Sequence, residues 1–163
     1  NNTYLTVPNY SFESPTTKTY VYDPTGASWT FSGHAGISAN GSGFTSGNPA
    51  APNGSQVGFV QDTGSFTQSV SGFVPGQTYT VTFSAAQRAN KSGGQAGETF
   101  DVQVNGAAVA HFAPPQAATG YNDYSATFVA NSSTNSISFV GTDLNGGDNT
   151  IFIDNVRIWT PNL

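Results

Sequence analysis

The sequence predicts an all-β protein, a sandwich of two antiparallel sheets, and three observations support this prediction. Short segments alternate apolar and polar residues, Gly, Pro, Asn or Asp bounds each segment, and no stretch has a credible helical pattern. The chain has 163 residues, of which 36% are hydrophobic, so it is long enough to bury a core. We therefore expect a single domain that spans residues 1–163.

Ten segments are expected to form strands, because each carries alternating apolar residues between turn formers. They are residues 20–22, 29–31, 57–60, 66–70, 79–83, 100–104, 109–112, 124–129, 137–140 and 151–159. Residues 40–53 and 90–97 are rich in Gly, Ser and Asn and show no periodicity, so we expect them to form loops at a rim.

One hairpin can be placed with particular clarity. Asn105 and Gly106 separate two alternating segments, and a two-residue type I′ turn requires a positive φ at both of its central positions. The sequence therefore predicts that residues 99–104 pair antiparallel with residues 107–112.

Two consecutive strands are expected to form a polar sheet face. Between residues 78 and 88 every second residue is apolar, so the opposite face is polar and ends at Arg88. Residues 99–104 repeat the pattern with Asp101 and Gln103 on their polar side. If these strands are neighbours, the three side chains share one surface.

Charge and composition exclude several classes of partner. The formal net charge is -5 and only four residues are Lys or Arg, so a phosphate backbone would be repelled and an anionic membrane surface is not favoured. No run of 18 apolar residues could span a bilayer. The absence of Cys removes disulfides and thiolate metal sites, so a secreted form would need another stabilising element, for which calcium is the obvious candidate.

Five segments carry a resemblance to a known group of proteins. In chain order they read PNYSFES from residue 8, WTF from 29, PNGSQV from 52, PGQTYTVTFSAAQR from 75 and IDNV from 153. This order resembles the calcium-containing jelly-roll carbohydrate-binding modules of families four, nine and twenty-two, and the related galactose-binding-like domains of cell-wall proteins. The resemblance implies a jelly-roll sandwich with calcium near the strand ends and glycan on a concave sheet face or at a loop rim.

The resemblance also implies a set of calcium ligands. They are the carboxylates of Glu13 and Asp154, a main-chain oxygen near Ser11, and main-chain oxygens near Asn53 and Gln56. Calcium takes roughly six to eight oxygen ligands, which this mixture could supply without thiolates. The alternative is that Asp154, which lies in an apolar strand, only accepts hydrogen bonds from neighbouring backbone groups.

A sugar site needs an aromatic ring for the apolar face of the sugar and planar polar groups for its hydroxyls. The candidate ligand-binding residues are Phe66, Gln68, Arg88, Lys91, Asp101, Gln103, Phe112 and Tyr121. The alternative to sugar binding is that Arg88 and Asp101 form an ion pair with each other on a solvent-exposed face. Trp29 and Trp159 are interpreted as core or edge residues.

The implied function is that of a non-catalytic, secreted and extracellular module that attaches a polysaccharide-degrading enzyme to its polymer. The polymer would be a β-glucan or, because Arg88 and Lys91 could meet a uronate or pyruvate group, an acidic polysaccharide such as xanthan or pectin. Residues 1–7 lack the features of a signal peptide, which favours a mature or excised piece.

Two other functions remain open. The first is an adhesion or structural domain that recognises a cell-surface protein, which an extensive exposed apolar patch would favour. The second, and least favoured, is a small glycoside hydrolase or lyase. Nine acidic residues are dispersed along the chain without an evident pair, and the sequence contains no G-x-S-x-G or HExxH motif.

Overall fold

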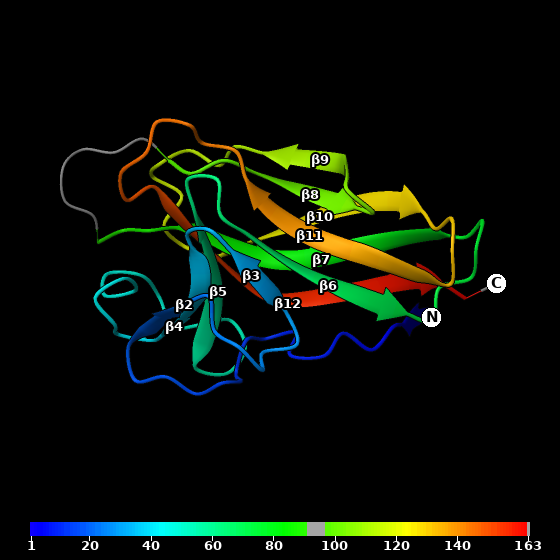
Figure 1. Ribbon diagram of the computed structural model, residues 1–163, viewed down its shortest axis with the longest axis horizontal. Coiled ribbons are helices and arrows are strands. Elements are labelled where there is room, and N and C mark those ends of the chain that lie inside the picture. Colours follow the sequence, from blue (N-terminus) through cyan, green and yellow to red (C-terminus); the bar gives the residue numbers. More distant parts are fainter. Residues whose placement is uncertain (91–96, 163) are drawn as a thin grey trace.

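The computed structural model describes residues 1–90 and 97–162, and within these residues it contains twelve strands and no helix (Figure 1). The strands are β1 (Asn2–Tyr4), β2 (Tyr20–Tyr22), β3 (Thr30–Ser32), β4 (Ala35–Ala39), β5 (Gln56–Gln61), β6 (Ser65–Ser71), β7 (Thr78–Gln87), β8 (Phe100–Val104), β9 (Ala107–Phe112), β10 (Asn122–Val129), β11 (Thr134–Gly141) and β12 (Thr150–Pro161). It follows that no described segment is a helix able to cross a membrane.

The strands form two antiparallel sheets that pack face to face. One sheet has seven strands in the order β10-β7-β12-β5-β4-β2, with β1 paired to β12, and the other has five in the order β3-β6-β11-β8-β9. Neighbours in each sheet are mostly distant in the chain, so the chain crosses repeatedly between the layers, as in a jelly roll. The N- and C-terminal ends lie together at one end of the sandwich (Figure 1).

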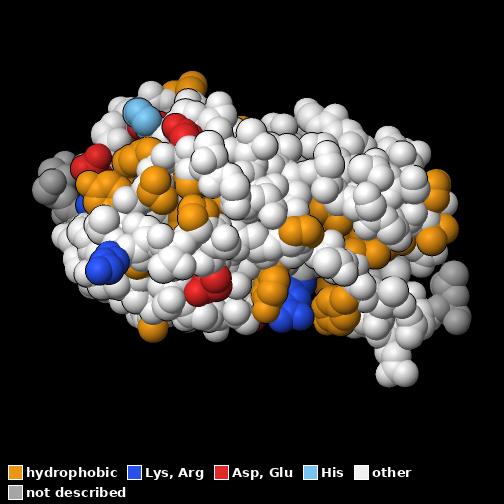
Figure 2. Space-filling view, turned by 60° about the horizontal axis from the view of Figure 1, so that its bottom comes forward, with side chains coloured by type: hydrophobic (Ala, Val, Ile, Leu, Met, Phe, Trp, Pro, Cys, Tyr) orange, Lys and Arg blue, Asp and Glu red, His pale blue; other side chains and the backbone are white. Residues whose placement is uncertain are grey.

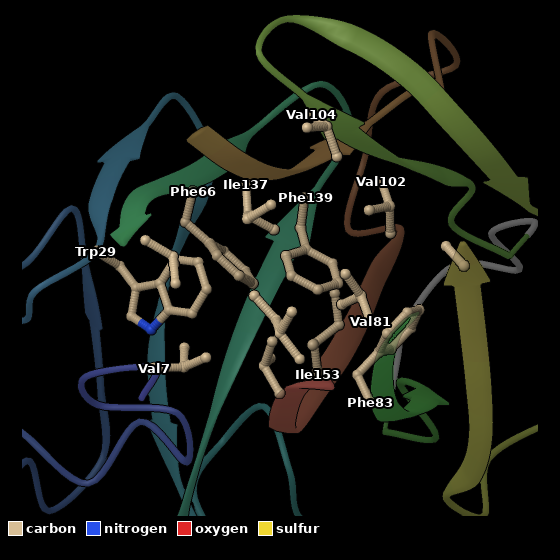
Figure 3. Packing of buried hydrophobic residues seen from close by; sticks show 14 of the residues in the cluster. Val7, Trp29, Phe66, Val81, Phe83, Val102, Val104, Ile137, Phe139 and Ile153 are labelled. Carbon is tan, nitrogen blue, oxygen red and sulfur yellow. The ribbon is translucent and has the colours of Figure 1, made fainter. Parts of the chain in front are cut away.

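The core fills the space between the two sheets. Phe66, Ile137 and Phe139 come from the five-stranded sheet and point toward side chains of the seven-stranded sheet, including Val81 and Ile153 (Figure 3). All five are fully buried. Each removes a large apolar area from water, at about 25 cal/mol per Å², and this burial holds the two layers together.

The predicted all-β sandwich is confirmed, and the strands that sequence analysis missed have a clear reason. Residues Asn2–Tyr4 of β1 are exposed and show no alternation, and residues Ala35–Ala39 of β4 are nearly all buried, so neither has a period of two. The predicted hairpin is also confirmed: Asn105 and Gly106 have φ values of 52° and 84°, and β8 pairs antiparallel with β9.

The predicted polar face shared by two consecutive strands is wrong. Strand β7 belongs to the seven-stranded sheet and β8 to the five-stranded sheet. The apolar faces of both strands point into the same core, so their polar faces point to opposite outer sides of the sandwich. Arg88 therefore lies on one side of the protein, and Asp101 and Gln103 lie on the other.

A β-bulge in β12 decides which of its side chains face outward. The pairing with β7 shifts between Asp154 and Arg157, and Asn155 in between has a φ of 55°. A bulge places two residues opposite one, so the alternation moves by one residue. As a result Asp154, Arg157 and Trp159 all lie on the outer face of the sheet, while Ile153 before the bulge stays in the core.

Candidate functional site

A hollow of about 370 Å³ lies on the outer face of the seven-stranded sheet, where β1, β12, β7 and β10 run side by side. Its lining combines aromatic, hydroxyl, amide and carboxylate groups, and the described lining residues include no Lys or Arg. They are Asn2, Tyr4, Thr82, Phe83, Ser84, Asp123, Tyr124, Ser125, Asn155 and Trp159. This is the mixture of groups that a sugar site requires.

Two aromatic side chains lie next to each other at one end of the hollow. Tyr4 of β1 and Trp159 of β12 are direct cross-strand partners, so their side chains lie on the same face of the sheet. Tyr4 is 54% exposed, and Trp159 is partly exposed. Two neighbouring rings that are open to solvent can stack on the apolar face of a ligand.

Polar groups occupy the other end of the hollow. The Ser84 hydroxyl donates a hydrogen bond of 2.8 Å to Asp123 Oδ1, so the carboxylate is held across β7 and β10. On the β12 side, Arg157 Nε donates a hydrogen bond of 3.1 Å to Asn155 Oδ1. These contacts fix an acceptor-rich carboxylate and an amide at the same surface as the two rings.

Two of the predicted ligand-binding residues lie in the core instead. Phe66 is fully buried and packs against Phe12, Trp29 and Phe139. Gln68 lies on the same inward face of β6, and its amide donates a hydrogen bond of 3.0 Å to the Pro8 main-chain oxygen. Neither side chain can reach a glycan in this fold, so these two predictions are wrong.

Three others belong to the five-stranded layer. Phe112 stacks on Phe100 with ring centroids 5.2 Å apart, at the margin of the core. Asp101 lies 2.6 Å from His111 Nδ1, so its partner is a histidine and not Arg88. Gln103 is partly exposed on the outer side of β8. None of these residues lines the hollow.

Two further candidates, Arg88 and Tyr121, lie beside a second hydrophobic cluster on the outer face of the seven-stranded sheet. The Arg88 guanidinium lies 4.5 Å from the centre of the Phe44 ring, and its Nε donates to the Asn90 main-chain oxygen. Tyr121 packs against the same cluster, and its hydroxyl is buried. Lys91 lies outside the described residues. The seven predicted ligand residues that the structure describes therefore do not form one site.

Sequence reasoning missed Tyr4 and Trp159 for identifiable reasons. Tyr4 belongs to a three-residue strand without a pattern, and Trp159 follows the bulge that shifts the alternation of β12. One signal was present: the inward residues Ile153 and Val156 are three positions apart, which reveals a bulge and places Trp159 outward.

Four of the five predicted calcium ligands, in contrast, are brought close together. Glu13 accepts main-chain hydrogen bonds from Ser55 and Gln56 at 2.9 and 3.1 Å, and Asp154 Oδ2 accepts one from Asn53 at 2.9 Å. Ser11 is buried two residues before Glu13. The groups that face the carboxylates are amide N–H groups, whereas sequence analysis expected main-chain oxygens.

One buried carboxylate oxygen of this group is left open to a cation. Asp154 is fully buried, and its Oδ1 has no hydrogen-bond partner among the described residues. Burial raises the pKa of Asp154 to about 7, the main-chain N–H of Asn53 opposes this rise, and the negative charge of Glu13 adds to it. Carboxylate oxygens that accept an N–H keep a second lone pair for a metal. A side chain at Gly54 would collide with the Glu13 carboxylate, which shows how closely the loop folds over it.

The raised pKa of Asp154 predicts how stability depends on pH in the metal-free protein. A carboxyl group whose pKa is higher in the folded state stabilises the fold below its unfolded value near 3.8, and this contribution is lost as pH rises through about 7. We expect the melting temperature in chelator to fall between pH 4 and pH 8. Asp154→Asn should reduce this fall, and an identical pH profile in the variant would contradict the assignment.

The fold and the hollow together define a jelly-roll sandwich of the kind found in carbohydrate-binding modules. A family 35 carbohydrate-binding module from Clostridium thermocellum is 16% identical, with a TM-score of 0.58 over 99% of each chain. The CBM22-1 xylan-binding domain from Paenibacillus barcinonensis Xyn10C is 14% identical, with a TM-score of 0.57 over 94% of each chain. A cyclase from Fischerella sp. TAU, in complex with 4-(1H-indol-3-yl)butan-2-one, is 18% identical, with a TM-score of 0.74 over 99% of each chain. At these identities the likeness shows the fold alone.

The chain belongs to the family described as "Protein of unknown function (DUF642)", which matches residues 5–158. No curated protein matches the sequence. The likeness in fold to carbohydrate-binding modules confirms the resemblance noted from the sequence at the level of the jelly-roll fold.

Proposed function

We propose that this chain is a non-catalytic carbohydrate-binding module and that its glycan lies in the hollow formed by β1, β12, β7 and β10. The observation that carries the proposal is the neighbouring pair Tyr4 and Trp159, two solvent-accessible rings beside Asp123, Asn155 and the hydroxyls of β7. Sugars offer apolar C–H faces to rings and hydroxyls to carboxylates and amides. The likeness in fold to a family 35 module and to a xylan-binding domain supports this choice of ligand class.

The single charged side chain of the described lining favours a neutral glycan such as a β-glucan over an acidic one, and the nearby cation Arg157 is already engaged by Asn155. Asp123 is the one charged residue in the described lining, and it would repel a uronate or pyruvate group. The guanidinium of Arg88 already contacts Phe44 and main-chain oxygens away from the hollow. On the face shown in Figure 2, most of the surface is uncharged and only a few charged side chains are visible.

The lack of paired acids in the hollow supports binding without hydrolysis. Glycoside hydrolysis usually needs two carboxylates about 5–9.5 Å apart across the bound sugar. Within the described lining Asp123 is the single carboxylate, and Asp154, which pairs with Ser84 on the same outer face, is fully buried. A binding module of this kind serves a secreted enzyme by keeping it on its polymer, which raises the effective concentration of substrate.

We propose that one calcium ion has a structural role at Glu13 and Asp154. The ion would join the N-terminal segment, the loop before β5 and the bulge of β12, three parts that are far apart in the chain. Calcium supplies no chemistry to glycan binding here. It would stabilise the seven-stranded sheet where β12 meets β5, next to the part that carries the hollow.

Affinity electrophoresis against soluble neutral and acidic polysaccharides tests the proposed function. We expect a neutral β-glucan to retard the protein, with no loss of polymer viscosity on prolonged incubation. Retardation by acidic polymers alone would contradict the neutral ligand. Falling viscosity would identify an enzyme, and no retardation by any polymer would favour the adhesion domain.

A substitution at the polar end of the hollow is expected to have a smaller effect on glycan affinity. Asp123→Asn keeps the shape of the side chain but removes its charge, so hydrogen bonds from sugar hydroxyls become weaker. We expect a several-fold rise in the dissociation constant, measured by isothermal titration calorimetry. Asp101→Asn on the opposite sheet is the matched control and should bind as the wild type does.

A further inference from the structure

A second hollow, of about 440 Å³, lies on the rim of the sandwich, toward the end away from the two chain ends (Figure 1). We call it the rim hollow, and its described lining consists of Tyr22, Asp23, Gly33, His34, Gln61, Gly147 and Asp148. Four chain segments contribute these residues: the end of β2, the turn before β4, the end of β5 and the loop between β11 and β12. The rim hollow shares no lining residue with the hollow at Trp159, so it is a separate place on the surface.

A buried amide belongs to the lining of the rim hollow. Gln61 is only 3% exposed, whereas the other polar side chains of this lining are exposed. Its Oε1 accepts a hydrogen bond of 2.6 Å from the Tyr22 hydroxyl, which orients the amide. Its Nε2 has no hydrogen-bond partner among the described residues. A buried donor without an acceptor is unfavourable, so a ligand oxygen at Gln61 would supply a contact that the protein lacks.

Two acidic side chains of the rim hollow face solvent. Asp23 and Asp148 are both exposed, and in the described part of the chain no salt bridge joins either of them to Lys or Arg. Burial raises the pKa of Tyr22, the hydrogen bond with Gln61 opposes this rise, and the negative charge of Asp148 adds to it. Asp148 therefore lies near the Tyr22 hydroxyl, and acceptor groups share one hollow with the amide of Gln61.

Two rings complete the lining of the rim hollow. The Tyr22 ring packs edge-on against Phe59, with ring centroids 5.3 Å apart, and 38% of Tyr22 remains exposed. The His34 ring lies 6.1 Å from the Tyr22 ring at an angle of 78°. His34 Nδ1 is 3.2 Å from Asp62 Oδ2, which orients the imidazole. The two rings thus form a corner whose exposed parts can contact the C–H groups of a sugar.

We propose that the rim hollow is a second binding site for a neutral sugar unit, independent of the hollow at Trp159. A sugar hydroxyl both donates and accepts hydrogen bonds, so sugar hydroxyls can serve the carboxylates of Asp23 and Asp148 as well as the Nε2 of Gln61. An ammonium group only donates, and would leave Gln61 without an acceptor. A carboxylate group would be repelled by the two acids.

A second site goes beyond the proposed function, which needs the hollow at Trp159 alone. The two hollows lie on different parts of the seven-stranded sheet and its rim, since one is lined by β1, β12, β7 and β10 and the other by the ends of β2 and β5. Two sites on one domain can hold a polymer more tightly than either does alone, because the second contact forms at a high effective concentration.

A two-dimensional NMR titration of the full chain with neutral oligosaccharides of glucose, xylose, mannose and galactose tests this proposal. The side-chain amide of Gln61 reports on the rim hollow, and the indole N–H of Trp159 reports on the other hollow. We expect both signals to move, each with its own dissociation constant. Asp148→Ala should raise the constant measured at Gln61 about tenfold and leave the constant measured at Trp159 unchanged. Leu144→Ala, which removes an 87% exposed side chain of the same loop outside the lining, is the matched control and should change neither.

Each alternative outcome has a definite meaning. Movement of the Trp159 signal alone overturns the second site and leaves the proposed function intact. Movement of the Gln61 signal alone supports the second site and contradicts the hollow at Trp159. A Gln61 signal that responds only to a glucosamine oligosaccharide, which carries ammonium groups, overturns the neutral ligand. A Gln61 response that is unchanged in Asp148→Ala also overturns the proposal, and no movement of either signal with any neutral oligosaccharide overturns both sites.

Discussion

Trp159→Ala is expected to weaken glycan binding by about tenfold or more, which corresponds to roughly 1.4 kcal/mol or above. Trp159 contributes the larger ring of the pair in the hollow, and aromatic anchors of this kind dominate binding energy at many interfaces. The loss should appear in calorimetry as a higher dissociation constant. Tyr4→Ala should act in the same direction with a smaller effect, because its ring is smaller and it lies on a short edge strand.

Two further variants separate a loss of contact from a loss of structure. Trp159→Phe keeps an aromatic face and should recover part of the affinity. Leu144→Ala removes a side chain that is 87% exposed and lies away from the hollow, so it should bind normally. Unchanged affinity in Trp159→Ala, together with an unchanged melting temperature, would remove the hollow as the binding site.

Removal of calcium is expected to cause the second large effect, a clear decrease in melting temperature. A ligand that binds the folded state alone stabilises it by about 3–4 kcal/mol when its concentration is 100 to 1,000 times its dissociation constant. Differential scanning calorimetry with calcium and with chelator measures the difference. In Asp154→Asn, which keeps the side-chain shape but loses the charge, the difference should become smaller.

Readdition of calcium is the control for this experiment, and it should restore the original melting temperature. Magnesium demands near-octahedral geometry and keeps its water, so it should restore less. Superimposable melting curves with and without chelator, in protein shown to lack metal, would contradict a structural ion at Glu13 and Asp154.

The fold could be predicted because its signals are local. Alternating residues such as Tyr79, Val81 and Phe83, and the turn at Asn105 and Gly106, report directly on backbone geometry and on burial. Strands with no alternation escaped this reasoning, as β1 and β4 show. Alternation of apolar and polar residues identifies a strand when one of its two faces is buried. It gives no signal when both faces are buried or when neither is.

The ligand surface could not be predicted from the same signals because it depends on which sheet each strand joins. The outward faces of β7 and β8 look alike in the sequence, yet the chain crosses to the other layer between them. Gln68 is a candidate ligand residue in the sequence, but in the fold it lies inward and its amide donates to the Pro8 main-chain oxygen. The resemblance paired Glu13 with Asp154 across the whole chain, and both carboxylates accept main-chain N–H groups of residues 53–56, but calcium binding there stays a prediction.

The two tryptophans allow the most direct test of the hollow as the glycan site. Trp29 is buried, and its indole Nε1 donates a hydrogen bond of 3.0 Å to the Asn9 main-chain oxygen, whereas Trp159 lines the hollow. In a two-dimensional NMR titration with a soluble β-glucan oligosaccharide, the indole N–H signal of Trp159 should move while that of Trp29 stays fixed. A saturating oligosaccharide that leaves the Trp159 signal in place, and moves signals of the five-stranded sheet, would contradict the site.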